Sequence, residues 1–415
     1  MRAGLWLMAL MWAAAPAWAD GPVRSPTGPD AAAYGEAAGY PVPPAGVLDG
    51  IAQEFHVGMH SRYDRFRALR PVPTSATASA LKRRTPQIEL TYEHKGRSSS
   101  ITEYLSTQPV TGLLIAQDDT ILYEHYQYGR SDEDRFLSHS MAKTITGLLV
   151  GAALEEGAIR SLDDVASVYV PELAGTEYGA TPIIDLLRMM SGMAFSERYT
   201  RGDDLDRMVR SLMGPGAPGA VEAIGQIQRR VQPPGTRFSY SSADSELLGL
   251  VLSRATQMPL ATYFSTRLWG PLGAEANAAW DVDAKGQEMT FCCVVARLRD
   301  WARLGLMIAH DGRWNGRQVV SRQWLNEMTT PDRSAYSRYG YQLWLSGGSR
   351  RYYVMRGIMG QRVLIDPAAR LVLVQTAVHR KATDTAADAD LTALWEALRS
   401  QQGLAERVGF EPTVR

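Results

Sequence analysis

The chain has 415 residues, 45% of them hydrophobic, and its 44 basic residues balance its 44 acidic residues. A chain of this length and composition can bury a large core in two packed lobes and is not disordered overall. Because the net charge is zero and no basic block stands out, neither nucleic acid nor an anionic membrane surface is indicated as a partner, and we expect a small-molecule ligand.

Residues 1–19 are predicted to be a secretory signal peptide. Met1-Arg2 gives a positive start, an apolar segment follows, and Ala17-Trp18-Ala19 is a small-x-small cleavage site. The apolar run is shorter than the roughly 20 residues that span a bilayer, and no later segment supplies another. We therefore expect a periplasmic or secreted protein that starts at Asp20 and has no stable membrane span.

Residues 20–99 are interpreted as an extension that precedes the main domain. Residues 20–50 are rich in Pro, Ala and Gly with few large apolar side chains, and are predicted to be a mobile leader. One amphipathic helix is expected within 51–70, a polar connector at 71–84 and an edge strand at 88–92. The sequence suggests no function for this extension.

Residues 100–400 have the pattern of a packed domain. Strands rich in Val, Leu and Tyr are expected at 111–116, 120–126, 352–355, 362–365 and 371–378. Helices are expected at 101–105, 140–157, 183–190, 245–255 and 392–399. This order predicts an α+β fold, in which an antiparallel sheet built from both ends of the domain is flanked by helices and a mostly helical lobe is inserted. A site is expected between the lobes, and residues 401–415 are predicted to be a flexible tail.

The predicted helix 140–157 is almost entirely apolar, yet a hydroxyl and an amine stand in its first turn. Three-residue spacing puts Ser140 and Lys143 on the same side of the helix, within mutual reach. Burial penalises an ammonium ion, so Lys143 is expected to lose its proton readily and to take the proton of Ser140 during attack. The pair is interpreted as a nucleophile and its base.

Ser-x-x-Lys alone is weak evidence, because Ser79 and Lys82 repeat the spacing in a polar run that opens no apolar helix. We interpret that copy as chance. Lys143 is more informative, since the chain has only five lysines against 39 arginines. The alternative is that Ser140 only caps the helix while Lys143 reaches the surface.

Two later segments offer further polar groups. Tyr240, in the loop before a helix, could relay a proton to a leaving group, and its phenolate would be favoured by the charge of Lys143. Ser242 could face the same cleft. The segment Arg356 to Gln361 interrupts two strands with glycines, which permit a backbone N–H to approach a substrate carbonyl. The alternative for Tyr240 is a half-buried loop tyrosine whose hydroxyl is hydrogen-bonded, and the alternative for the glycine-bearing segment is a simple hairpin turn.

The cysteines and histidines suggest no further centre. Cys292 and Cys293 are neighbours and make a poor structural bridge, so disulfides are not expected to hold the fold. His56 and His60 have helical pair spacing, but no HExxH motif or carboxylate partner follows. His139 is interpreted as structural rather than basic, and neither a metal nor an organic cofactor is expected.

These motifs, in this order and with these separations, resemble the serine hydrolases of the penicillin-recognising fold: class C β-lactamases, penicillin-binding proteins and related esterases. The sequence around these motifs is similar in particular to that of the 6-aminohexanoate-dimer hydrolases, in the segments 161–165, 186–192, 300–305 and 357–361. The resemblance covers residues 100–399. It implies that Ser140 is the acyl-forming nucleophile, Lys143 its base and Tyr240 the proton relay. It also implies an oxyanion hole made by the backbone N–H groups of Ser140 and Ile358, with Ser242, Gly357, Met359 and Gly360 as substrate-binding residues.

The chain also departs from that pattern. Met355-Arg356-Gly357 stands where β-lactam-recognising relatives carry Lys-Thr-Gly, and Tyr240-Ser241-Ser242 replaces the Tyr-x-Asn of class C enzymes. The resemblance therefore implies a hydrolase of a linear amide or ester. The alternatives are a β-lactamase or D-Ala-D-Ala carboxypeptidase, and a catalytically silent binding protein with the same fold. The acyl group, the leaving group and the oligomeric state are left open.

Overall fold

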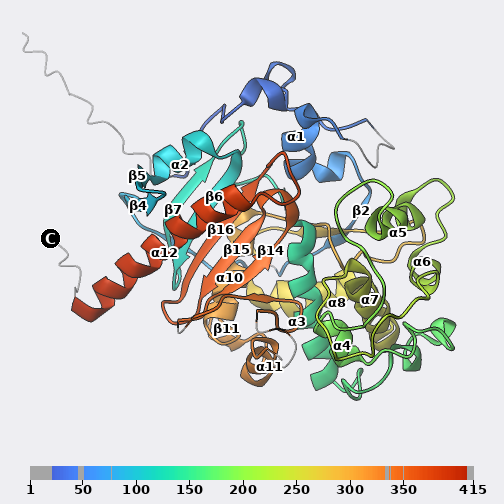
Figure 1. Ribbon diagram of the computed structural model, residues 1–415. Helices are drawn as coiled ribbons and strands as arrows, with labels where there is room; N and C mark the ends of the chain where they lie inside the picture. The colour runs from blue at the N-terminus through green and yellow to red at the C-terminus, as the bar shows by residue number, and fades with distance from the viewer. Residues whose placement is uncertain are drawn as a thin grey trace, which may run out of the picture.

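A computed structural model describes residues 21–44, 51–75, 77–331, 336, 338–348 and 350–408. At its centre is an eight-stranded sheet to which both ends of the chain contribute (Figure 1). The strand order is β1-β7-β6-β16-β15-β14-β13, and β3 also pairs with β7. The bounds are Val23–Arg24 (β1), Lys82–Arg83 (β3), Val110–Gln117 (β6), Thr120–Tyr126 (β7), Trp344–Leu345 (β13), Tyr353–Arg356 (β14), Arg362–Asp366 (β15) and Leu371–Ala377 (β16). All pairs from β7 to β13 are antiparallel, as predicted, while β1 and β3 run parallel to β7.

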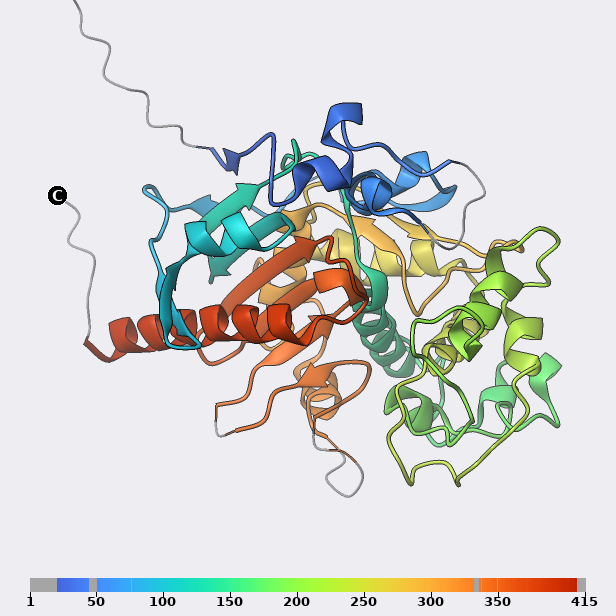
Figure 2. The ribbon, with the colours of Figure 1, turned by 45° about the horizontal axis from the view of Figure 1, so that its top comes forward.

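Both faces of the central sheet are covered by helices, which explains why its inner strands are apolar without interruption. Leu371 and Leu373 of β16 pack toward helices α2 (Ile101–Thr107) and α12 (Thr385–Val408). Val372 and Val374 point the other way and join the core formed with α10 (Leu298–Ala309). Figure 2 shows α12 lying along its face of the sheet. This period of two is what a strand buried on both sides requires.

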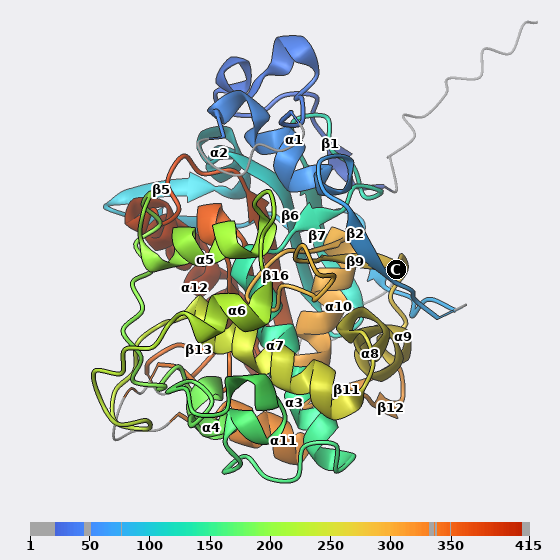
Figure 3. The same cartoon turned by 90° about the vertical axis from the view of Figure 1, so that its right-hand side faces the viewer.

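The second lobe is mostly helical and is inserted between the early and the late strands (Figure 3). Its helices are α3 (Ala142–Glu155), α4 (Ile183–Leu187), α5 (Asp204–Met213), α6 (Ala220–Gly225), α7 (Ser242–Thr256), α8 (Leu260–Phe264) and α9 (Gly270–Leu272). A four-stranded sheet links the lobes through β2 (Leu69–Val72), β9 (Ala278–Asp281), β10 (Val294–Ala296) and β8 (Phe136–Leu137). The remaining elements are α1 (His56–Ser61), α11 (Arg322–Met328), β4 (Thr91–His94), β5 (Arg97–Ser100), β11 (Arg313–Trp314) and β12 (Arg317–Gln318). The predicted α+β architecture with an inserted helical lobe is confirmed.

The prediction of a mobile leader is wrong for residues 21–44. Tyr34 and Tyr40 are buried, and both rings pack edge-on against Tyr128 with centroids 5.6 Å apart. The hydroxyl of Tyr34 donates to the carbonyl of Val378 at 2.7 Å. Two buried aromatic rings with satisfied hydroxyls are enough to hold a segment whose composition otherwise suggests disorder. The segment 45–50 and the predicted signal peptide lie outside the described residues.

Several predicted boundaries also shift. The single helix expected within 51–70 is only the six-residue α1, followed by a turn and then β2. The edge strand expected at 88–92 is instead β4, which pairs with β5 in a separate two-stranded sheet. Helix α7 begins three residues earlier than expected because the hydroxyl of Ser241 accepts from the backbone N–H of Asp244 at 3.2 Å. Helix α12 continues to Val408, so the first part of the predicted tail is helical.

Candidate active site

Ser140 lies in a short 3-10 turn, His139–Met141, that leads directly into α3. Strand β14 ends against this turn. A Cβ atom on Gly357 would lie 2.4 Å from the carbonyl oxygen of Ser138, so only glycine lets the end of the strand approach so closely. The buried helix predicted at 140–157 is present as α3, and Gly157, with a φ of 74°, follows its end.

Lys143 is buried and has three polar neighbours. Its Nζ lies 3.0 Å from Ser140 Oγ, 3.0 Å from Ser242 Oγ and 2.9 Å from the carbonyl oxygen of Phe291. Burial lowers the pKa of Lys143 to about 8, and the nearby carboxyl groups of Glu197 and Glu246 keep it from falling further. The alternative of a lysine that reaches the surface is excluded by this geometry.

Ser242, at the first turn of α7, connects Lys143 to a carboxylate that the sequence analysis missed. Its hydroxyl donates to Glu197 Oε1 at 3.0 Å, and its backbone N–H donates to Oε2 at 2.8 Å. Glu197 also accepts from Tyr199 at 3.0 Å. No sequence signal could have found Glu197, because it stands 45 residues before Ser242 in a loop with no recognisable motif.

Tyr240 lies beside the same pair. Its ring is stacked on Trp344 with centroids 5.5 Å apart, and the ammonium of Lys143 lies 5.0 Å from its centre. Burial first, and then the charge of Glu197, raise the pKa of Tyr240 above its ordinary value, while a hydrogen bond to Ser140 offsets part of that rise. The expectation of a favoured phenolate is therefore wrong, and the group next to Ser140 is a neutral phenol.

The residues expected around the oxyanion hole separate into two groups. Ile358 lines the same cavity as Ser140. Met359 has left-handed backbone angles, and its N–H donates to the carbonyl of Ala382 at 2.9 Å. Gly360 is buried against His379. Within the described part of the chain, Gly357, Met359 and Gly360 do not line the cavity beside Ser140.

The cavity beside Ser140 has a volume of about 250 Å³. Besides Ser140, Ser242, Glu197 and Ile358, its walls come from three places: the extension, helix α5 with Tyr199, and the turn that contains the cysteines. These residues are Ile51, Met59, Tyr63, Phe66, Leu205, Val209, Met213, Phe291, Cys292 and Cys293, with Leu137 and His139 beside the nucleophile. The extension, for which the sequence suggested no function, thus forms part of the site.

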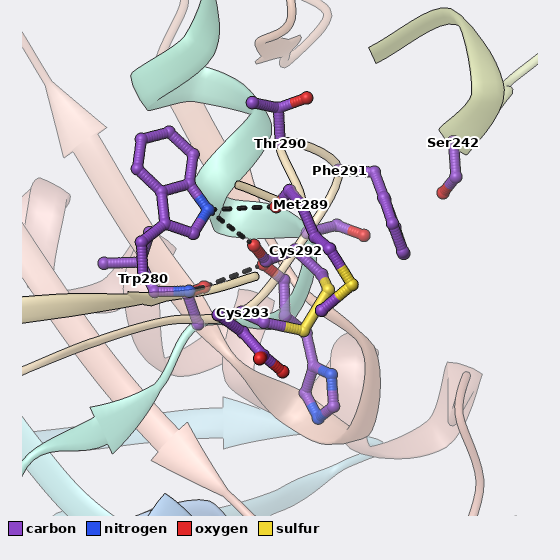
Figure 4. Close-up of a disulfide and its surroundings, with 12 residues drawn as sticks. Ser242, Trp280, Met289, Thr290, Phe291, Cys292 and Cys293 are labelled. Carbon is purple, nitrogen blue, oxygen red and sulfur yellow. Dashed lines mark hydrogen bonds between the residues drawn. A yellow bond between two sulfur atoms is a disulfide. The ribbon is translucent and has the colours of Figure 1, made fainter. Parts of the chain in front are cut away.

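Cys292 and Cys293 are joined to each other by a disulfide, and a bond between sequence neighbours agrees with the expectation that disulfides do not hold the fold. The bond closes no loop between distant segments, but it rigidifies a tight turn in which Cys293 has a φ of 74°. Trp280 Nε1 donates to the carbonyl groups of Met289 and Cys292 at 2.9 and 3.0 Å (Figure 4). The turn is therefore held on both sides of Phe291, whose carbonyl oxygen accepts from Lys143.

The histidines near the nucleophile contact one another. His139 Nε2 lies 2.8 Å from His60 Nε2, and burial lowers the pKa of His139 to about 3, so the ring is neutral. His60 Nδ1 lies 2.7 Å from the carbonyl oxygen of His56. Among the residues that the structure describes, no group of three or more His, Cys, Asp or Glu side chains is arranged to hold a metal ion.

The second Ser-x-x-Lys has no catalytic geometry. Ser79 is buried, where its hydroxyl accepts from Trp314 Nε1 at 2.8 Å and donates to the carbonyl of Leu272 at 3.1 Å. Lys82 is exposed and pairs with Asp119 at 2.9 Å. This agrees with the interpretation of that copy as chance.

None of the helices in the described residues combines the length and the apolar character that a membrane crossing requires.

Known proteins share both the sequence pattern and the fold. Residues 101–398 match the family model described as Beta-lactamase. A 6-aminohexanoate-dimer hydrolase of Paenarthrobacter ureafaciens is 27% identical over 312 residues, which cover 67% of this chain and 75% of that protein. A β-lactamase of Yersinia enterocolitica is 24% identical over 187 residues, which cover 42% of this chain and 44% of that protein.

Solved structures superpose over most of the chain. A Bacillus anthracis protein assigned to the 6-aminohexanoate-dimer hydrolases gives a TM-score of 0.75 at 20% identity, covering 85% of this chain and 95% of the other. A family VIII carboxylesterase gives a TM-score of 0.53 at 17% identity, covering 70% and 93%. The fold is therefore the one that β-lactamases share with penicillin-binding proteins. Since the family model spans nearly the whole catalytic domain, the chain belongs to the β-lactamase family and is a serine hydrolase with that fold.

Proposed function

We propose that this protein hydrolyses a linear amide or ester through an acyl intermediate on Ser140. Lys143 is the base, Tyr240 relays the proton, and the backbone N–H groups of Ser140 and Ile358 bind the oxyanion. The observation that carries this proposal is the set of three contacts around Lys143 Nζ, because they orient the neutral amine toward the nucleophile.

A neutral lysine has two N–H bonds and one lone pair. The carbonyl oxygen of Phe291 can only accept, so it takes one N–H. The hydroxyl of Ser242 donates its own proton to Glu197, so it accepts the second N–H. The lone pair is left facing the hydroxyl of Ser140 at 3.0 Å. With a pKa of about 8, Lys143 is neutral in a useful fraction of molecules near neutral pH and can take this proton during attack.

The next steps follow from the position of Tyr240. The proton accepted by Lys143 must reach the leaving nitrogen or oxygen, and the neutral phenol beside Ser140 can donate its own proton there while recovering one from Lys143. Water then attacks the acyl-serine, and the same groups run in reverse order to release the acid and restore the Ser140 hydroxyl. No step needs a metal or an organic cofactor.

A linear substrate fits the end of β14 better than a bicyclic β-lactam. Met355, at the position of the lysine in Lys-Thr-Gly, is fully buried and has no donor. Arg356 pairs with Asp388 at 2.7 Å, and its guanidinium lies 5.9 Å from the centre of the Trp344 ring. The charged hydrogen bonds that would hold a drug carboxylate are worth about 1.5–3 kcal/mol each, so their loss costs roughly ten- to 150-fold.

The test of the chemistry is covalent labelling. An activated ester or fluorophosphonate should add to Ser140, as located by peptide mass mapping, and Ser140→Ala should abolish both labelling and turnover. Lys143→Ala and Tyr240→Phe should each lose several orders of magnitude in rate, and the losses should not add, because members of one catalytic unit fail together. Label that persists in Ser140→Ala, or that maps to Ser79, would contradict the assignment.

The test of the substrate class compares specificity constants on one preparation. We expect kcat/KM for p-nitrophenyl butyrate to exceed kcat/KM for nitrocefin and for benzylpenicillin. A tenfold advantage of either β-lactam would reverse the preference and favour the β-lactamase alternative, while leaving Ser140 as the nucleophile.

We further propose that the mature protein is periplasmic or secreted. The sequence of residues 1–19 supports this, and so does the disulfide, because such bonds persist in oxidising compartments. Edman sequencing of the exported protein should read from Asp20, whereas retention of Met1 would contradict cleavage.

A further inference from the structure

The cavity beside Ser140 and the cleft beside the group that must meet the leaving atom are lined by different residues. Tyr240 does not line this cavity among the described residues. Its ring stacks instead on Trp344, which lines a separate cleft of about 580 Å³ with Tyr352 and Arg356. Because the proton relay must contact the leaving nitrogen or oxygen, the leaving group extends toward Trp344. The acyl chain is then directed into the cavity.

The polar groups of the cavity already have partners. Glu197 accepts from Ser242 and Tyr199. The hydroxyl of Tyr63 is turned to Asp281, to which it donates at 2.7 Å. No lysine or arginine is among the described residues that line the cavity. An acyl group ending in a carboxylate would therefore find no cation and would be repelled by Glu197.

The rest of the lining is apolar and comes from separate segments of the chain. The extension contributes Met59 and Phe66, helix α5 contributes Val209 and Met213, and the disulfide-bonded turn contributes Cys292 and Cys293. An ammonium ion at the end of a long acyl chain would be stripped of water among these side chains. A terminal methyl group would gain from the same burial.

Resting on the proposed hydrolysis at Ser140, we infer that this cavity is the acyl pocket and that it selects uncharged aliphatic acyl groups of medium length. A cavity of about 250 Å³ holds on the order of eight groups of water size, each taking roughly 30 Å³. In this pocket the acyl chain packs against Val209 and Met213 of α5 and against Met59 and Phe66 of the extension.

The experiment measures kcat/KM for p-nitrophenyl esters from acetate to dodecanoate. We expect a rise of about fourfold for each added methylene as far as octanoate, followed by a fall. Val209→Trp fills the pocket and should lower the octanoate-to-acetate ratio at least tenfold, while Met213→Ala should move the maximum to longer chains. Val168→Trp is the matched control, since Val168 is 45% exposed and does not line the pocket, and it should keep the wild-type profile.

Two further comparisons separate the possible outcomes. The kcat/KM of p-nitrophenyl 6-aminohexanoate should be at least tenfold lower than that of p-nitrophenyl hexanoate. A higher kcat/KM for the ammonium ester would overturn the inference, because Glu197 would then be a cation site. Alkyl acetates of increasing alcohol length should respond equally in wild type and Val209→Trp. If Val209→Trp changes the rates of the alkyl acetates and not those of the acyl esters, the pocket is not the acyl site. The same conclusion follows if Met213→Ala and Val209→Trp both keep the wild-type acyl profile. Failure of the proposed function itself would give a different result, because Ser140→Ala would then still hydrolyse the acetate ester.

Discussion

The carboxylate of Glu197 should control the pH at which Lys143 becomes a base. Glu197 receives the hydroxyl proton of Ser242, and Ser242 accepts from Lys143, through two hydrogen bonds of 3.0 Å each. The two charges are therefore no more than about 6 Å apart, and at an effective dielectric constant of about 20 their attraction is about 3 kcal/mol. That attraction corresponds to about 2 units in the pKa of Lys143.

Glu197→Gln removes this charge and keeps the size of the side chain. Without the carboxylate, the pKa of Lys143 should fall from about 8 toward about 6. The neutral amine is the active form, so activity should appear at lower pH, and the acidic limb of the kcat/KM profile should move down by up to about 2 units. The plateau should drop roughly tenfold, because one end of the amide cannot accept from the Ser242 backbone N–H.

The assay is the pH profile of kcat/KM for p-nitrophenyl butyrate between pH 5 and pH 10, with Ser140→Ala as the blank. Glu246→Gln is the matched control. Glu246 also raises the pKa of Lys143, but less than Glu197 does, and burial raises its own pKa to about 8, so its replacement should move the limb less than Glu197→Gln does. An acidic limb that stays in place in Glu197→Gln, or moves to higher pH, would refute the orientation of Lys143 by Ser242 and Glu197.

Other parts of the site make separate predictions. Ser242→Ala removes one of the two acceptors that hold the N–H bonds of Lys143, and we expect kcat to fall at least tenfold with intact folding by circular dichroism. Reduction by a phosphine should add two hydrogens to Cys292 and Cys293, as read by intact mass, and should lower kcat/KM because the turn that holds the Phe291 carbonyl loosens; unchanged activity of the reduced protein would contradict this. EDTA should leave the rate unchanged, and a loss that zinc restores would overturn metal-free catalysis.

The parts of the structure that the sequence predicted are those with local signals. The richness of the late strands in Val, Leu and Tyr and the long apolar run after Ser140 predicted the sheet and α3, because each pattern reports burial of that same segment. Ser140, Lys143 and Tyr240 were placed together because their motifs have fixed spacing and order. The burial of Tyr34 and Tyr40 was missed, since composition averages over a segment, whereas two buried aromatic residues are enough to order it.

The residues that tune the site could not be predicted for the same reason. Glu197 is held near Lys143 by Ser242, which is brought there by a helix that begins 45 residues later. The disulfide matters because its turn points one carbonyl at the same amine, a fact that no spacing of cysteines encodes. A neutral lysine with both N–H bonds occupied has only one direction left for its lone pair. Its acceptors therefore turn a spacing that occurs twice in this chain into a base at one position only.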